Sequence, residues 1–181
     1  MRDAEHLTNL LGTAVVSKTH PRIELRGRFD ELNARIILVQ TQAQDAGLPD
    51  LEADLEEVRS KIVELMSCEV RDAPCGEFSL WGLSDEEIRQ RSHTPEKYYG
   101  LGHILPHPDM GRWAAELNLL RTLVREAELC ACRAFACDAE GNVSRPDIVS
   151  ALNRLSSALY ILTYKYLPDG YDRIISFGRR T

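Results

Sequence analysis

Asn118, Arg121, Arg125 and Glu128 recur at helical spacing within the stretch 113–137, beside a continuous row of leucine, valine and alanine residues. Side chains three or four residues apart lie on one face of a helix, so this polar stripe runs along the edge of an apolar face. Guanidinium groups in such a place are typical of an anion site, because arginine binds phosphate and carboxylate oxygens bidentately. A solvated helix face with ion pairs is the alternative, and one helix alone does not decide between them.

Two other predicted helices carry polar groups beside their apolar seams. The first, at 21–45, has four of them along one edge: Arg22, Arg26, Asp30 and Asn33. The last, at 144–168, has a second, partly polar stripe made of Val149, Asn153, Ser156, Tyr160 and Thr163. Because three of the four long helices offer charged or amide groups near the core, these groups favour one enclosed site.

A carboxylate that faces an arginine across two helices neutralises a buried charge and holds the guanidinium in place. Asp30 and Arg121 are the candidate pair, which would leave other arginines free to meet phosphate oxygens. Lys18, just before the first helix, could add a mobile positive charge nearby, although a lysine in that position is more commonly only exposed.

Residue types that ligate transition metals gather locally only at His103, His107 and Asp109. A pair of histidines four residues apart ligates a metal from a helix, but Pro106 and Pro108 rule out a helix here. The chain also has no phosphate-binding P-loop, no nucleophile elbow and no dinucleotide-binding glycine motif. We therefore expect no resident metal, and any phosphate must be bound by arginine and lysine side chains.

The composition is that of one folded globular domain. The 181 residues are 44% hydrophobic and 28% charged, and their formal net charge is -6 with an isoelectric point near 5.4. This acidic balance argues against nucleic acid as a partner. No apolar run approaches the roughly 20 residues of a membrane helix. We predict a single domain over 1–181, with a core at about 17–167 and a basic tail at 168–181, in the cytoplasm.

Five cysteines cannot all pair within one chain, which fits a reducing compartment. Cys130, Cys132 and Cys137 fall on one predicted helix. Thiols two residues apart on a helix point in different directions, so we interpret these cysteines as small packing residues rather than metal ligands.

Helical periodicity predicts most of the elements. Apolar residues alternating by three and four predict one helix over 21–45 and a second from an Asp50 cap to about Leu65. The segment 68–83 shows no convincing strand and is predicted as a loop. Ser84 and Glu87 form a capping box for a short helix that ends near residue 91.

The C-terminal half repeats this alternation of loops and helices. Thr94 followed by a proline starts another short helix, and the glycines and prolines of 100–111 predict an irregular loop. The long helix 113–137 follows. Ser144 and Asp147, in capping-box register, open the last helix, whose seam runs to Pro168.

Three segments in order resemble the cobalamin adenosyltransferase family. They are SKTHPRIELRGRFDELNA at 17–34, NLLRTLVREAE at 118–128 and LNRLSS at 152–157. Between them, RSHTPEKYYG at 91–100 and HILP at 103–106 are similar to the ethanolamine-utilisation branch rather than the propanediol-utilisation branch. The likeness runs from His6 to Tyr166, which makes chance a poor explanation.

The resemblance implies an all-α, five-helix up-and-down bundle, usually assembled as a trimer with ATP between adjacent subunits. It also implies an ATP:cob(I)alamin adenosyltransferase, which moves the 5'-deoxyadenosyl group of ATP to Co(I) of a corrinoid, releases triphosphate and forms adenosylcobalamin. ATP, Mg²⁺ and cobalamin are the expected small molecules. A reductant protein such as a flavodoxin is a candidate partner, and whether a bacterial microcompartment encloses the protein stays open.

Residue roles follow from the same resemblance. It implies that Arg121 pairs with Asp30 at the subunit boundary as the catalytic pair. The residues implied to bind ATP are Lys18, Arg22, Arg125, Glu128 and Asn153, the last two also with magnesium. The apolar lid expected under the corrin consists of His103, Ile104, Leu105 and Pro106. Such a lid would exclude water and the lower base, so that four-coordinate cobalt can be reduced.

Three departures from the family leave alternatives open. The stretch 1–16 does not match the glycine-rich phosphate loop of the propanediol branch, so the grip on triphosphate can differ. An upstream histidine and cysteine metal cluster of some ethanolamine-type enzymes would lie before the first residue. His103 stands where the propanediol branch has phenylalanine, and we interpret it as lid rather than cobalt ligand. A non-catalytic corrinoid-binding relative and a helical scaffold remain the alternative functions.

Overall fold

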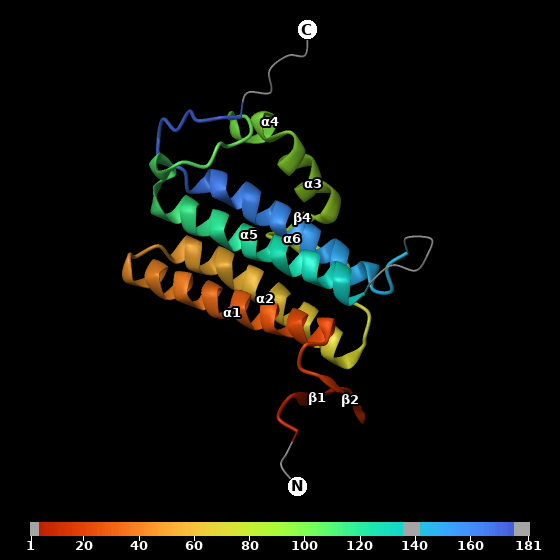
Figure 1. Cartoon of the computed structure of the whole chain (residues 1–181). Coiled ribbons are helices and arrows are strands. Elements are labelled where there is room, and N and C mark those ends of the chain that lie inside the picture. Colours follow the sequence, from red (N-terminus) through yellow and green to blue (C-terminus); the bar gives the residue numbers. More distant parts are fainter. Residues whose placement is uncertain (1–3, 136–141, 176–181) are drawn as a thin grey trace.

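Four long helices form the body of the protein (Figure 1). The computed structural model describes residues 4–135 and 142–175. The long helices are α1 (Pro21–Asp45), α2 (Pro49–Arg71), α5 (Gly111–Ala134) and α6 (Pro146–Lys165). Helix α1 packs against α2 and α5, and α5 packs along α6. This arrangement confirms the predicted all-α bundle.

Two short helices, α3 (Asp85–His93) and α4 (Pro95–Tyr99), lie beside α6 near one end of the bundle. Of the six α-helices in the described ranges, the five-residue α4 is the addition to the expected five-helix bundle. Proline is favoured at the first helical position because it lacks an N–H that would have no partner there. Pro95 therefore starts α4 immediately after Thr94, the residue that caps the end of α3.

The predicted apolar seams form the core. Leu25, Phe29, Ile36 and Val39 of α1 are fully buried, and most seam residues of α2, α5 and α6 are buried with them. Burying one such side chain contributes about 1.5–3 kcal/mol. The shared seams bring the polar edges of α5 and α6 side by side, which is what positions the site.

Helix α2 differs from the prediction at both ends. It begins at Pro49, and Leu48 is its N-cap residue, so the prediction of an Asp50 cap is wrong. Asp50 instead lies in the first turn, where a carboxylate interacts favourably with the helix dipole. The helix also continues past Leu65 to Arg71, which makes Cys68 a buried helical residue rather than part of a loop.

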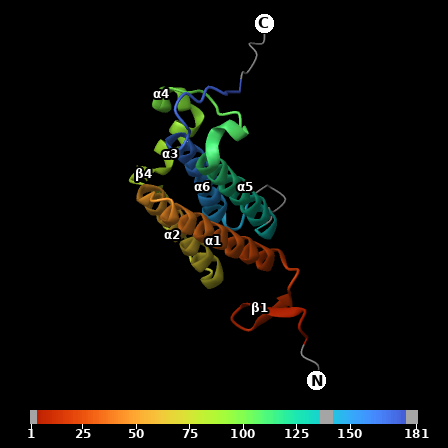
Figure 2. The same ribbon diagram turned by 90° about the vertical axis from the view of Figure 1, so that its left-hand side faces the viewer.

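Two small hairpins were not predicted. Strands β1 (Leu7–Leu11) and β2 (Ala14–Ser17) pair antiparallel and project from the end of the bundle where α1 begins, far from α4 (Figure 2). Strands β3 (Ser79–Leu80) and β4 (Leu83–Ser84) lie where a loop without strands was expected, so that prediction is wrong.

The β3–β4 hairpin forms because its turn is anchored to α2. Trp81 and Gly82 both have positive φ, 53° and 71°, as a tight two-residue hairpin turn requires. A tryptophan rarely adopts this conformation. Here the Trp81 backbone N–H donates to Glu57 at 2.8 Å and its indole N–H donates to the Asp54 carbonyl at 3.1 Å.

Of the two predicted capping boxes, one forms. The Ser84 hydroxyl and the Glu87 carboxylate cap α3 reciprocally, as predicted. The box at Ser144 and Asp147 does not form, because Arg145 is the N-cap residue of α6. Asp147 instead pairs with Arg145 at 2.8 Å and accepts the Cys75 N–H at 2.9 Å, which ties the loop after α2 to the start of α6.

The contacts of Asp147 with Arg145 and Cys75 predict that the fold loses stability at acid pH. The Arg145 guanidinium, and then the Cys75 N–H, hold the pKa of Asp147 well below its ordinary value. A carboxyl group with a depressed folded-state pKa stabilises the fold above its unfolded pKa of about 3.9 and loses that contribution as pH falls further. We expect Asp147→Asn to flatten the dependence of unfolding free energy on pH below about 4, as urea titrations at several pH values would measure. An unchanged slope would show that Asp147 contributes nothing.

The ends of the described ranges bear on the remaining predictions. Helix α5 ends at Ala134, and Cys137 lies outside the described residues. Cys130 is fully buried against α1, as a small packing residue would be. The predicted loop 100–111 is irregular up to residue 110 apart from an isolated bridge at Ile104 and one 3-10 turn, η1 (Pro108–Met110), and Gly111 already begins α5. No helix in the described parts of the chain is both long and apolar enough to cross a membrane.

Candidate active site

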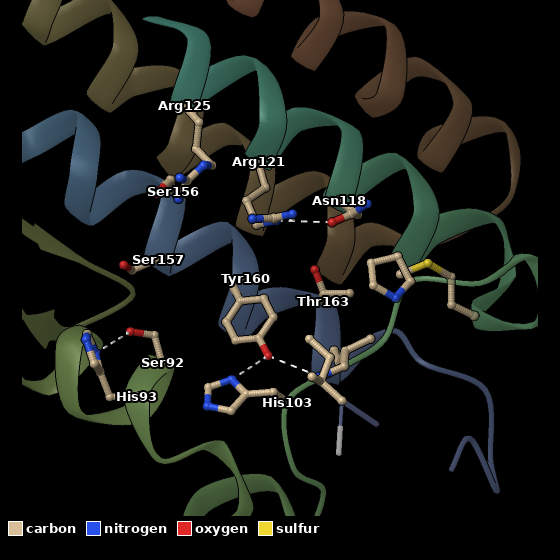
Figure 3. A pocket seen from close by; sticks show the side chains of 14 residues that line it. Ser92, His93, His103, Asn118, Arg121, Arg125, Ser156, Ser157, Tyr160 and Thr163 are labelled. Carbon is tan, nitrogen blue, oxygen red and sulfur yellow. Dashed lines mark hydrogen bonds between the residues drawn. The ribbon is translucent and has the colours of Figure 1, made fainter. Parts of the chain in front are cut away.

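A cavity of about 410 Å³ opens between α5 and α6 on the side covered by α3 and the loop 103–106. Figure 3 shows its side chains pointing inward from these elements. The wall on α5 consists of Asn118, Arg121 and Arg125, and the wall on α6 includes Ser156, Tyr160 and Thr163. The two polar stripes expected from the sequence thus face one space.

The two arginines give this cavity a positive charge. Arg121 is half-buried and its Nε donates to the Asn118 Oδ1 at 3.1 Å (Figure 3). Burial, and then the neighbouring charge of Arg125, lower the pKa of Arg121 from its ordinary value. Neither guanidinium forms an ion pair with any residue in 4–135 or 142–175. Two such guanidinium groups one helical turn apart have the charge and the donors that an anion requires.

The loop 103–106 forms the opposite wall. His103, Ile104 and Pro106 line the cavity, whereas Leu105 is 49% exposed and does not. Ile104 is only 4% exposed and sits against the α6 side of the space. The resemblance predicted that the loop 103–106 and the two arginines act on ATP and the corrinoid together. In the structure of a single chain, both line the same cavity.

Sequence reasoning missed the C-terminal segment. The Ile175 N–H donates to the His103 carbonyl at 2.7 Å, and the Leu105 N–H donates to the Arg173 carbonyl at 3.0 Å. Ile104 and Ile174 form an isolated antiparallel bridge, and Ile175 lines the cavity. The described part of the predicted basic tail therefore holds the loop in place, and its last residues, 176–181, lie outside the described ranges.

Arg22 does not reach the cavity. Its Nε contacts the Glu69 Oε1 at 2.6 Å, and Arg26 contacts the other oxygen of the same carboxylate at 2.5 Å. Glu69 is completely buried. A buried carboxylate requires such partners, because desolvation of a lone charge costs several kcal/mol. Two arginines of the polar edge of α1 thus belong to an ion cluster between α1 and α2. Glu69 completes this cluster because α2 continues beyond its predicted end.

Lys18 and Asp30 are exposed and also lie outside the cavity. Lys18 follows β2 directly, and Asp30 faces away from the core of α1. The described part of a single chain contains no ion pair between Asp30 and Arg121. The Arg121 side chain points into the cavity between α5 and α6, away from α1. That pairing stays a prediction, and it requires two chains.

Glu128 and Asn153 do meet. The Asn153 side-chain N–H donates to the Glu128 carboxylate at 2.8 Å, joining α5 to α6. Glu128 lies about one turn beyond Arg125 on the same edge of α5. The pair therefore continues the polar stripes of α5 and α6 beyond the residues that line the cavity.

Two of the three residues of metal-ligating types near the loop stay together, with the His107 Nδ1 3.1 Å from the Asp109 Oδ2, whereas His103 lies apart from them. Asp109 pairs with Arg173 at 2.8 Å, and His103 lines the cavity without the other two residues. In the ranges described, no group of three or more histidine, cysteine, aspartate or glutamate residues could hold a metal ion.

Comparison with known sequences assigns this architecture to a family. The sequence model of the cobalamin adenosyltransferase family matches residues 3–166. Corrinoid adenosyltransferase EutT of Salmonella typhimurium is 35% identical over 162 residues, 90% of this chain and 59% of that protein. Its Escherichia coli counterpart is 37% identical over 156 residues, 86% of this chain and 57% of that protein. Corrinoid adenosyltransferase PduO of Salmonella typhimurium is 32% identical over a match that covers 91% of this chain and 48% of that protein. The chain thus spans 57–59% of the two EutT proteins.

Solved structures share the fold. A variant of the PduO-type ATP:corrinoid adenosyltransferase from Lactobacillus reuteri, complexed with cobalamin and ATP, superposes with a TM-score of 0.68 over 94% of both chains at 18% identity. Another variant of that protein, complexed with ATP, gives a TM-score of 0.62 over 95% of this chain and 96% of that one, also at 18% identity. With the family match over most of its length, the chain belongs to the cobalamin adenosyltransferase family.

Proposed function

We propose that this protein is a corrinoid adenosyltransferase of the ethanolamine-utilisation type. It would transfer the 5'-deoxyadenosyl group of ATP to Co(I) of a corrinoid, forming adenosylcobalamin and releasing triphosphate. One observation carries the proposal: Arg121 and Arg125 share a cavity with the apolar wall of Ile104 and Pro106. The reaction needs both surfaces, one for an anionic leaving group and one for a dry corrin face.

The reaction requires the protein to position the two substrates and to stabilise the charge of the departing triphosphate. The Co(I) electron pair forms the cobalt–carbon bond while the bond from C5' to the triphosphate oxygen breaks, and the negative charge leaves with triphosphate. No proton transfer is required. Arg125 would bind the departing triphosphate, and Arg121 would hold its neighbouring oxygens, in a fixed geometry that needs no rearrangement during the reaction. Their freedom from ion pairs with described residues supports these roles.

The corrin would lie over the mouth of the cavity, since a corrinoid is larger than the space itself. A neighbouring hollow of about 460 Å³ shares His93 and His103 with the cavity and continues it outward along α4. Ile104, Met110 and Ile175 would contact the corrin face from below and keep water from cobalt. Leu105, exposed beside them, would extend this apolar surface.

Glu128 and Asn153 suit a magnesium–nucleotide complex. Magnesium commonly binds one carboxylate together with substrate phosphates and water. The Asn153 amide donates an N–H to Glu128, and its oxygen would serve as a further ligand. When bound, Mg²⁺ would offset phosphate charge beside Arg125. These residues would orient the nucleotide.

A second copy would complete the site, and we propose a homotrimer. Asp30 lies on an exposed face of α1 with Ile37 and Leu38, each 44% exposed. On α5, Leu119 and Leu129 are 39% and 60% exposed. Such a row of exposed apolar side chains is typical of a subunit interface. Across it, Asp30 of one subunit would pair with Arg121 of another.

The same interface would bring the start of α1 to the nucleotide. Lys18 is exposed at that end and would bind triphosphate as a mobile point charge. Arg22 is held by Glu69 at 2.6 Å, so its share in nucleotide binding would be to fix the Lys18 segment. The proposed location is the cytoplasm, within or outside a microcompartment, with a reductant protein such as a flavodoxin supplying the electron that makes Co(I).

Single-turnover measurement with reduced cobalamin and ATP tests this function. We expect the absorbance change of cobalt–carbon bond formation with one triphosphate released per corrinoid. ATP should also raise the melting temperature, since a ligand that binds only the folded state stabilises it. Corrinoid binding without conversion would identify a non-catalytic relative. A scaffold would bind neither substrate.

A further inference from the structure

Two tyrosines on adjacent turns of α6 bind the backbone of the lid segment. The Tyr160 hydroxyl accepts the Ile104 N–H at 3.1 Å and lies 3.1 Å from the His103 Nδ1 (Figure 3). It also lies 2.9 Å from the Tyr164 hydroxyl, which donates to the Gly102 carbonyl at 2.8 Å. One hydroxyl pair thus contacts three consecutive residues: Gly102 and the first two residues of the lid, His103 and Ile104.

The chemistry of these groups fixes where each hydrogen lies. A carbonyl oxygen only accepts, so the Tyr164 hydrogen must point to Gly102. The contact between the hydroxyls then requires Tyr160 as donor. With its one hydrogen used, the Tyr160 oxygen can only accept from the His103 ring. The His103 Nδ1 therefore carries a hydrogen, whether the imidazole is neutral or charged.

The opposite arrangement leaves one contact without a hydrogen. If Tyr160 donated to His103, Tyr164 would have to donate to Tyr160. The Tyr164 oxygen and the Gly102 carbonyl would then face each other at 2.8 Å as two acceptors. The first arrangement makes all four bonds and fills the capacity of the Tyr160 hydroxyl, which is one donor and two acceptor positions.

Packing keeps this chain of hydroxyls in place. The Tyr164 ring stacks on Tyr99 of α4 with centroids 4.7 Å apart, and its edge meets the Tyr160 ring at 5.4 Å. The His103 ring lies nearly parallel to Tyr160, at 18°. Burial, and then the contact with Tyr160, raise the pKa of Tyr164, so its phenol stays protonated and remains a donor.

We propose that Tyr160, supported by Tyr164, is a positioning residue: it accepts the hydrogen on the His103 Nδ1 and holds the ring against α6, and so keeps Nε2, the nitrogen that carries the lone pair in a neutral ring, out of the lower coordination position of cobalt. This role rests on the proposed function. It explains how the site could carry an imidazole beside the corrin while the chemistry needs cobalt without a lower ligand. Loss of the Tyr160 hydroxyl would remove this hydrogen bond from the His103 ring and leave the Ile104 N–H without its acceptor.

Electron paramagnetic resonance of bound cob(II)inamide with ATP would test the proposal, because this corrinoid lacks the lower nucleotide base. Any nitrogen splitting must then come from the protein. We expect none with the wild-type protein, clear splitting with Tyr160→Phe, and its disappearance in the double variant Tyr160→Phe with His103→Phe. Tyr98→Phe, on the exposed side of α4, is the matched control and should behave like the wild type.

Turnover and ligand-free protein give independent readouts. A misplacement of about 1 Å can cost on the order of 100-fold, so we expect Tyr160→Phe to lower kcat by about 10- to 100-fold with little change in the KM for ATP. The imidazole nitrogen shifts in ligand-free protein should show hydrogen on Nδ1 in the wild type. A ring with hydrogen only on Nε2, nitrogen splitting in the wild type, or an unchanged Tyr160→Phe would overturn the proposal. A wild type that binds no corrinoid would instead refute the proposed function, and the ligand-free shifts would still test the hydrogen placement.

Discussion

Replacement of Arg125 by alanine is expected to lower kcat for adenosyl transfer by about 100- to 1000-fold, the range found when one preorganised donor to a developing oxyanion is removed. The effect is large because Arg125 has no carboxylate partner among the described residues and lines the cavity directly. Its charge is available to the leaving triphosphate alone. Among the described residues that line the cavity, the other guanidinium is that of Arg121, one turn away.

The measurement is single-turnover formation of the cobalt–carbon bond at saturating ATP. Arg133→Ala is the matched control, since this arginine lies on the same helix, is 58% exposed and pairs with Glu24 at 3.3 Å. It should retain nearly full activity. Arg125→Lys should recover only part of the rate, because a lysine cannot bind two oxygens in a fixed fork. Equal activity of Arg125→Ala and Arg133→Ala would favour the scaffold.

How much the sequence predicts depends on how local each signal is. The bounds of α1 and the capping box of Ser84 and Glu87 were predictable, because periodicity and capping act within a few residues. The same rules failed at Ser144 and Asp147, where Arg145 and the Cys75 N–H compete for the carboxylate. Cys75 is 72 residues away in the chain. A capping rule that considers only neighbouring residues cannot predict a hydrogen bond to so distant an N–H group.

The candidate site shows the same limit. Helical spacing alone predicted that the stripe of Arg121 and Arg125 would border the core, but only the family resemblance connected it with the loop 103–106. The part played by Ile175 had no detectable signal, since its segment pairs with the loop through one isolated bridge, between Ile174 and Ile104. The Tyr160 stripe was visible, whereas its hydrogen bonds to His103 and Ile104 depend on how a loop 56–57 residues away folds back.

Loss of the Glu69 carboxylate should give the largest change in stability. Glu69 is fully buried and contacts Arg22 and Arg26, whose side chains are only 13% and 19% exposed. Glu69→Ala would leave two guanidinium groups close together with little solvent, and the remaining carboxylate beside them among the described residues is that of Asp72, which is 55% exposed and 3.4 Å from Arg22. Breaking a buried pair in this way costs about 3–5 kcal/mol. We expect a fall of that size in the unfolding free energy, measured by urea denaturation.

Two comparisons separate lost charge from lost packing. Glu64→Ala removes a partner of Lys61 on the same helix, but this carboxylate is 39% exposed, and such pairs contribute about 0–1 kcal/mol. Replacing Glu69, Arg22 and Arg26 together by leucine should restore much of the stability, because a buried ion cluster is often no better than an apolar one. Recovery of the unfolding free energy would show that Arg22 and Arg26, both in the segment 17–34, hold α1 against α2. A cost for Glu69→Ala no larger than that for Glu64→Ala would leave Arg22 free to leave its partner and bind nucleotide directly.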